Sequence, residues 1–181
     1  MHDLKLFTLG HSNNSSDDFV NLLNHYGIKV LVDIRMIPFS SRYSHFSQDA
    51  LRSSMERNNI IYHWAGRQLG GRRKPNAESI HRALQDDALR GYADHMQTDG
   101  FKKSASQLMQ LAASHCLAIM CAEKSPQHCH RNLLADYLSL QAVKVIHAVD
   151  VKENYLHQIS PLARRESAKL IYDRFVTDTL F

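Results

Sequence analysis

The chain has 181 residues, of which 44% are hydrophobic and 22% are charged, and its formal net charge is +4. A chain of this length normally folds into one domain, and this composition is unlike that of disordered or fibrous proteins. No apolar run approaches the roughly 20 residues that a membrane helix needs, and the first residues lack the pattern of a signal peptide. We therefore expect one cytoplasmic domain over residues 1–181, with no membrane partner.

Short apolar strands alternate with amphipathic helices along the whole chain. The pattern predicts strands over residues 4–10, 28–34, 60–64, 116–122 and 143–147. It predicts helices starting near Ser15 and Ser47, over 80–84 and 101–112, around 133–138, and in a C-terminal tail over 161–176. The alternation predicts an α/β fold in a single three-layer domain, with a mainly parallel sheet of about five strands and a Rossmann-like or rhodanese-like topology.

Polar side chains follow several of these strands at the point where each strand ends. They are His11 and Ser12 after the first strand, Asp33 and Arg35 at the end of the second, and Cys121 and Glu123 at the end of the fourth. The carboxyl ends of parallel strands share one edge of a sheet, where α/β proteins bind their ligands. The long loops 35–46 and 65–75 follow strands and lie at the same edge.

Asp33 and Arg35 alternate with apolar neighbours in a strand that is otherwise expected to be buried. An unpaired charge there would be costly, so the two side chains either pair with each other or meet a ligand. Both interpretations remain open at this point.

The segment 119–131 combines a strand end, a loop and the start of a helix with several reactive side chains. His128 and Arg131 lie one helical turn apart and are expected to face a ligand, whereas His130 shares a face with buried leucines. Cys121 is either a strand-end nucleophile or a small core residue.

The same segment could be read as a metal site. His128 and His130 diverge on a helix, and the spacing patterns of zinc sites are absent, so no metal is predicted. A site built from Cys121, Cys129 and His11 stays a minor alternative. The three cysteines are expected to be free thiols.

Gly70, Gly71, Arg72, Arg73 and Lys74 form a basic loop with a flexible backbone. Arginine and lysine bind phosphate, so this loop is a candidate phosphate site. A solvated basic loop with no ligand is the alternative.

Five motifs occur in order: Thr8–Asn13, Val32–Ser40, Leu69–Arg72, Gly91–Met96, and Met120–Glu123 with His128–Arg131. On these motifs residues 4–148 closely resemble the domain-of-unknown-function family four-eight-eight, and residues 149–181 form a tail outside it. The resemblance implies a small α/β cytoplasmic bacterial protein without an established reaction. It singles out His11, Ser12, Asp33, Arg35, Gly70, Gly71, Arg72, Tyr92, Cys121, Glu123, His128, Cys129, His130 and Arg131.

Taken together, these residues predict an enzyme or enzyme-derived domain that acts on a phosphate-bearing ligand, either a nucleotide or a nucleic acid. Carboxylates beside imidazoles favour hydrolysis, with His11, Asp33, Glu123 and His128 as candidate catalytic residues. Candidate ligand-binding residues are Ser12, Arg35, Gly70, Gly71, Arg72, Arg73, Tyr92, Cys121, Cys129, His130 and Arg131. The alternatives are a non-catalytic nucleic-acid-binding module and a metal-binding or thiol-redox protein. The sequence predicts no oligomeric state.

Overall fold

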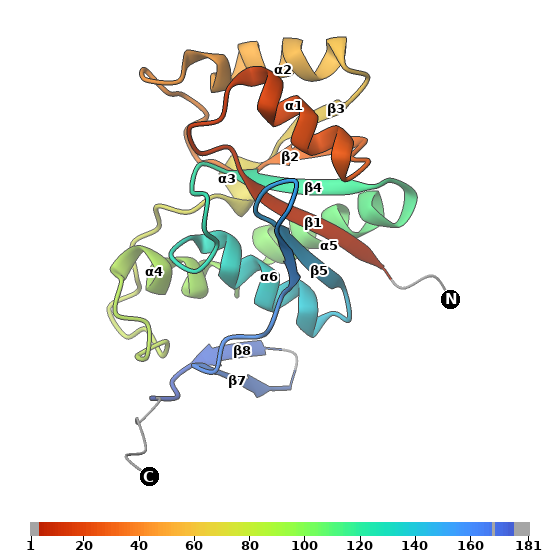
Figure 1. Cartoon of the computed structure of the whole chain (residues 1–181). Coiled ribbons are helices and arrows are strands. Elements are labelled where there is room, and N and C mark those ends of the chain that lie inside the picture. Colours follow the sequence, from red (N-terminus) through yellow and green to blue (C-terminus); the bar gives the residue numbers. More distant parts are fainter. Residues whose placement is uncertain (1–3, 168, 176–181) are drawn as a thin grey trace.

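The fold is built on a six-stranded sheet with the strand order β3-β2-β4-β1-β5-β6 (Figure 1). The computed structural model describes residues 4–167 and 169–175. The first five strands along the chain are parallel, as predicted, and β6 adds an antiparallel edge. Their bounds are β1 Lys5–Gly10, β2 Val30–Asp33, β3 Ile61–Trp64, β4 Leu117–Cys121, β5 Lys144–Ala148 and β6 Asn154–Leu156.

Helices cover both faces of the sheet, which confirms the three-layer arrangement (Figure 1). One face carries α1 Ser16–His25 and α2 Gln48–Arg57, whose apolar side chains pack on Phe7 and Leu9 of β1. The other face carries α4 Asp87–His95, α5 Asp99–Ser114 and α6 His130–Leu140, which pack with Leu6 of β1. Successive residues of a strand point to opposite faces, so β1 contributes to both cores. The short η1 Ser44–Phe46 and α3 Gly66–Leu69 lie in the two long loops.

The sheet has a topological switch point between β1 and β4, which are hydrogen-bonded neighbours. The chain leaves β1 towards α1 on one face and leaves β4 towards α6 on the opposite face (Figure 1). A crevice opens where two adjacent strands send their connections to opposite sides, and ligands of α/β proteins bind there. The fold therefore places the loops 11–15 and 122–129 beside each other at the carboxyl edge of the sheet.

Two predicted helices are wrong, and the two segments contact each other. The strands β7 Ala163–Glu166 and β8 Lys169–Tyr172 pair as an antiparallel hairpin, and residues 80–84 form turns. The amide of Ala83 donates to the Tyr172 carbonyl at 2.9 Å, and the Tyr172 amide donates to His81 Nδ1 at 3.2 Å. The pairing of β7 with β8 and these two hydrogen bonds satisfy backbone groups that a helix would have satisfied internally. The described part of the tail, to residue 175, is therefore not helical, and Val176 lies outside the described residues.

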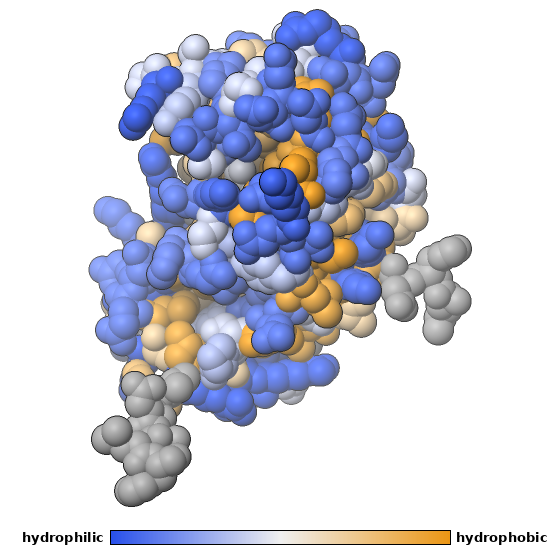
Figure 2. Space-filling view, viewed as in Figure 1, coloured by the Kyte–Doolittle hydropathy of each residue, from blue (hydrophilic) through white to orange (hydrophobic). Residues whose placement is uncertain are grey.

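The face seen in Figure 2 is mostly hydrophilic, with hydrophobic residues scattered in small patches, as on most monomeric domains. Among the described residues, no helix combines the length and the apolar character that crossing a bilayer requires.

Candidate functional site

A cleft of about 810 Å³ opens at the switch point, within the size range of small-molecule sites. Its walls come from the loops after β1, β2 and β4 and from Gly71 and Arg72. The predicted residues that line it are His11, Ser12, Arg35, Gly71, Arg72, Cys121, Glu123, Cys129 and His130. Residues from four separate segments of the sequence thus meet in one place.

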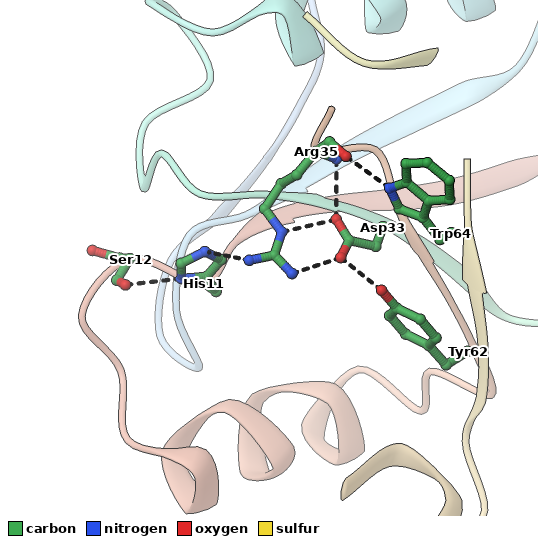
Figure 3. Close-up of polar contacts among 6 residues, drawn as sticks. All are labelled: His11, Ser12, Asp33, Arg35, Tyr62 and Trp64. Atoms are coloured by element: carbon green, nitrogen blue, oxygen red, sulfur yellow. Dashed lines mark hydrogen bonds and ion pairs between the residues drawn. The ribbon is translucent and has the colours of Figure 1, made fainter. Parts of the chain in front are cut away.

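Asp33 and Arg35 form a buried ion pair at the end of β2 (Figure 3). Arg35 Nε donates to Asp33 Oδ1 at 2.9 Å, and Nη2 donates to Oδ2 at 2.6 Å, a bidentate geometry. The Tyr62 hydroxyl donates to Oδ2 at 2.8 Å, and the Trp64 indole donates to the Arg35 carbonyl at 2.9 Å. Of the two interpretations of this pair, the structure supports mutual pairing, which presents Arg35 to the cleft and leaves Asp33 fully buried.

His11 is held as a neutral ring between two partners (Figure 3). Its Nδ1 lies 2.9 Å from the Ser12 carbonyl, which can only accept, so Nδ1 carries the proton. Nε2 then accepts from Arg35 Nη1 at 3.2 Å. Burial, together with the nearby Arg35 charge, lowers the pKa of His11 to about 4. Its ring also stacks on Phe46, with centroids 4.2 Å apart. Both ring nitrogens are therefore hydrogen-bonded, and His11 serves to position Arg35.

Cys121 and Cys129 bring their sulfur atoms to 3.0 Å in the wall of the cleft. Cys129 is the N-cap of α6, and its Sγ accepts the Arg131 amide at 3.5 Å. A hydrogen bond from Cys121 is the main reason that the pKa of the Cys129 thiol falls to about 4, with further help from His130 and Arg131 against the effect of burial. The same hydrogen bond and burial raise the pKa of Cys121 well above its ordinary value. The two pKa shifts are opposite, so Cys129 is the sulfur whose surroundings favour the thiolate form.

Arg131 is among the most deeply buried side chains, with 1% of its surface exposed. Its Nη2 donates to the carbonyls of Glu123 and Lys124, at 3.1 Å each, while Nε and Nη1 are buried without a partner. Within residues 4–167 and 169–175 no carboxylate forms an ion pair with it. Arg131, which was predicted to face a ligand, therefore does not line the cleft, because the guanidinium lies beneath the loop, where its charge lowers the pKa of Cys129.

Four other predicted residues do not line the cleft. Tyr92 is buried and donates its hydroxyl to the Leu69 carbonyl at 2.9 Å. Arg73 donates to the carbonyls of Gly70 and Arg67, so its guanidinium stabilises the conformation of the basic loop. Gly70 is buried in the same loop, and His128 is exposed outside the cleft. Cys129 caps α6, so the helix begins only after the loop that carries His128.

Two glycines allow the walls to approach closely. A side chain at Gly10 would overlap the Glu123 carbonyl, and one at Gly71 would come within 2.7 Å of the His130 ring. These positions need glycine for space between loops.

The sequence analysis missed several residues that line the cleft. Phe39 is 70% exposed and Ile37 is 56% exposed, and both line the cleft with Tyr43. Lys124 lines it from the opposite loop. Large apolar side chains flanking a proline in a strand-end loop were the available clue.

A second cavity, of about 800 Å³, lies between β3, α3 and α5, and no predicted site residue lines it. In the described part of the chain, no three His, Cys, Asp or Glu side chains are grouped so that they could hold a metal ion.

Comparison with known proteins gives a family and no closer relative. Searches among curated proteins and among solved structures find no match. The family model described as Domain of unknown function DUF488 matches residues 15–138, which run from the N-cap of α1 to the last turns of α6. This match covers more than half of the chain and includes Asp33, Arg35 and both cleft cysteines. The chain therefore belongs to the DUF488 family.

Proposed function

We propose that this protein is a hydrolytic enzyme that binds a nucleotide in the cleft at the switch point. The observation that carries the proposal is the meeting in the cleft of Arg72, which forms no ion pair within the described residues, with Lys124 and an exposed aromatic ring. Arg72 and Phe39 lie in different loops and line the same cleft with Lys124.

The cations fit a phosphate group. Arg72 is exposed in the basic loop, and Lys124 is 58% exposed, with only a long 3.9 Å contact to Asp150. Arg35 adds the N–H groups that Asp33 and His11 leave unused, in a buried and pre-positioned guanidinium. A phosphate held by three such donors from three loops would be fixed in orientation.

The apolar wall fits a base. Phe39 and Ile37 are exposed to solvent at the cleft, and Tyr43 lies beside them in the same loop. Nucleobases stack on aromatic side chains, typically with about 1–3 kcal/mol per base. A nucleotide is therefore favoured over inorganic phosphate or a sugar phosphate.

Glu123 is the carboxylate best placed for proton transfer. It is exposed, lines the cleft, and makes no side-chain hydrogen bond or ion pair among those found in the described residues. Asp33 is saturated by Arg35 and Tyr62, so its role is to position the guanidinium. Glu123 would activate a water for attack on the bound nucleotide.

Calorimetry with adenosine monophosphate, together with chromatography of the incubated nucleotide, tests this proposal. Arg72→Ala is expected to weaken binding by about 1.5–3 kcal/mol, the usual range for a charged hydrogen bond. Lys74→Ala is the matched control, because Lys74 is exposed in the same loop but does not line the cleft. Phe39→Ala should also weaken binding, and Ile80→Ala, which removes an exposed apolar side chain elsewhere, should not.

Glu123→Gln is expected to keep binding and abolish turnover, because it preserves shape and removes the base. Equal binding by wild type and Arg72→Ala would contradict the proposal.

One observation keeps the nucleic-acid-binding module as a second candidate. Arg67, Arg72 and Lys74 are all exposed on one short stretch of chain. Binding of single-stranded DNA that weakens steeply with salt, and that survives Glu123→Gln with no turnover by the wild type, would favour this module.

A further inference from the structure

We propose that Cys121 and Cys129 form a dithiol centre that exchanges with low-molecular-weight disulfides, with Cys129 as the attacking thiolate and Cys121 as the resolving thiol. This activity shares the cleft with the proposed nucleotide site but does not depend on it.

The positions of the two sulfurs support the proposal. Cys121 ends β4 and Cys129 caps α6, and their Sγ atoms lie 3.0 Å apart. A disulfide bond is about 2.05 Å long, so a shift of about 1 Å would join them. Both side chains are mostly buried but line the cleft, which gives a small disulfide a route to them.

The surroundings of Cys129 stabilise a negative charge on its sulfur. The sulfur lies at the amino end of α6, an eleven-residue helix, and accepts the Arg131 amide. The Arg131 guanidinium is buried with two unpartnered nitrogens and no carboxylate among the described ion pairs. A buried cation without a counterion is costly, and the Cys129 thiolate is the anion that meets this need.

The exchange balances with the disulfide RS–SR as the oxidant. The Cys129 thiolate attacks one sulfur, a new S–S bond forms, and RS⁻ leaves. Cys121 then loses its proton to the departed RS⁻, its sulfur attacks Cys129 Sγ, and a second RS⁻ leaves as the Cys121–Cys129 bond forms. The protein dithiol is oxidised by two electrons, and RS–SR is reduced to one RSH and one RS⁻.

The second step is favoured by the first. Cys121 holds its proton because it donates a hydrogen bond to the Cys129 thiolate. Once Cys129 is in a mixed disulfide, that charge is gone, while the Arg131 charge still lowers the pKa of Cys121. The resolving thiol therefore becomes a better nucleophile at the moment when it is needed.

Cys116 is the matched control within the same chain. It is half-buried at the opposite end of β4, where its Sγ donates to the Tyr26 carbonyl at 3.5 Å, and burial raises its pKa. Its environment offers neither a thiol partner nor a helix start.

The test treats the full-length protein at pH 6 with 2-hydroxyethyl disulfide, a neutral probe, and follows adducts and disulfides by mass spectrometry. Wild type and Cys116→Ser should release two equivalents of thiol and end with a Cys121–Cys129 disulfide. Cys121→Ser should stop with one stable adduct on Cys129. Cys129→Ser should react on the order of a hundredfold more slowly, because an ordinary thiol is mostly protonated at this pH. Serine is itself a good N-cap, so this variant is expected to fold, and its thermal unfolding verifies that.

The proposal is overturned if Cys129→Ser reacts like wild type, or if wild type accumulates a stable adduct without forming the internal disulfide. The probe carries no phosphate or base, so its failure leaves the nucleotide proposal intact. Conversely, a failure of adenosine monophosphate to bind leaves the thiol exchange intact.

Discussion

Two polar clusters lie along α6, and they differ in how many of their hydrogen-bonding groups lack a partner. The first is the cleft, where Cys129 caps the helix. The second, which we call the histidine network, consists of Thr8, His147, His157, Asp136 and Tyr172 and lies further along the same helix. Both contain histidines with little exposure, and neither has a compact sequence motif that covers it.

In the histidine network every side-chain nitrogen and carboxylate oxygen is partnered. The His147 ring lies 2.7 Å from Thr8 Oγ1 and 2.8 Å from His157 Nδ1, and His157 Nε2 lies 2.7 Å from Asp136 Oδ1. The Tyr172 hydroxyl donates to Asp136 Oδ2 at 2.8 Å. The chain of bonds links β1, β5, α6 and the C-terminal hairpin, so its role is to hold these elements together.

The cleft, by comparison, contains hydrogen-bonding groups that lack a partner. Arg35 has unused N–H groups, Arg131 beneath the cleft has two unpartnered nitrogens, and Cys129 lines the opening. Burial of a polar residue is therefore a weak guide to function here. Unused bonding capacity beside a cavity is the better guide.

Asp136→Ala should give the largest effect, because it leaves the His157 ring, the Tyr172 hydroxyl and the Ser160 amide without their acceptor. We expect the free energy of unfolding to fall by about 3–5 kcal/mol in urea titrations, as for other broken buried pairs. Glu78→Ala, in an exposed turn, should stay within about 0.5 kcal/mol of wild type. A small loss for Asp136→Ala would mean that the network is not structural.

Acid should destabilise both regions through their neutral histidines. Burial is the main cause that lowers the pKa of His147 to about 3 and of His11 to about 4. The unfolded chain takes up protons below about pH 6.5 while the folded protein does not, so stability falls as the pH drops below that value. Between pH 7 and pH 5 we expect each histidine to lower the free energy of unfolding by about 1–2 kcal/mol, as measured by urea titration. His147→Asn and His11→Asn should each flatten this dependence, and an unchanged slope in both would contradict the assignment.

Arg131→Met should act on the cleft by removing the buried cation beside Cys129. The pKa of Cys129 should rise, and for a rise of one unit from about 4, alkylation by iodoacetamide at pH 4.5 should slow about threefold. Arg57→Met, on an exposed side of α2, is the control and should leave the rate unchanged. An unchanged rate for Arg131→Met would show that the thiolate is stabilised without this charge.

Tyr62→Phe should give the smallest effect, because Asp33 keeps its bonds to Arg35 when the tyrosine hydroxyl is lost. The free energy of unfolding should fall by about 1 kcal/mol, typical of one hydrogen bond. Tyr155→Phe removes a hydroxyl that bonds only to exposed Gln127 and should cost less. Equal losses for the two variants would argue against a special role for the Asp33 carboxylate.

The sequence predicted the cleft better than the histidine network, for physical reasons. Strand periodicity places His11, Arg35 and Cys121 at strand ends, and parallel strands bring those ends to one edge. The network depends on Tyr172, whose hairpin is paired through backbone contacts with residues 81–83, and no local pattern encodes such a contact. The burial of Arg131 was also not predictable, because its position on the helix gives its direction but not the path of the loop above it.

The absence of a side chain at Gly10 has a consequence for the width of the cleft. The backbone of Gly10 lies against the Glu123 carbonyl, where even one methyl group would not fit. The two loops that continue from this point carry His11 on one side and the acidic Glu123 on the other. A methyl group at position 10 would push these two loops apart at their origin, so the absence of a side chain there sets how closely the two walls of the cleft approach each other.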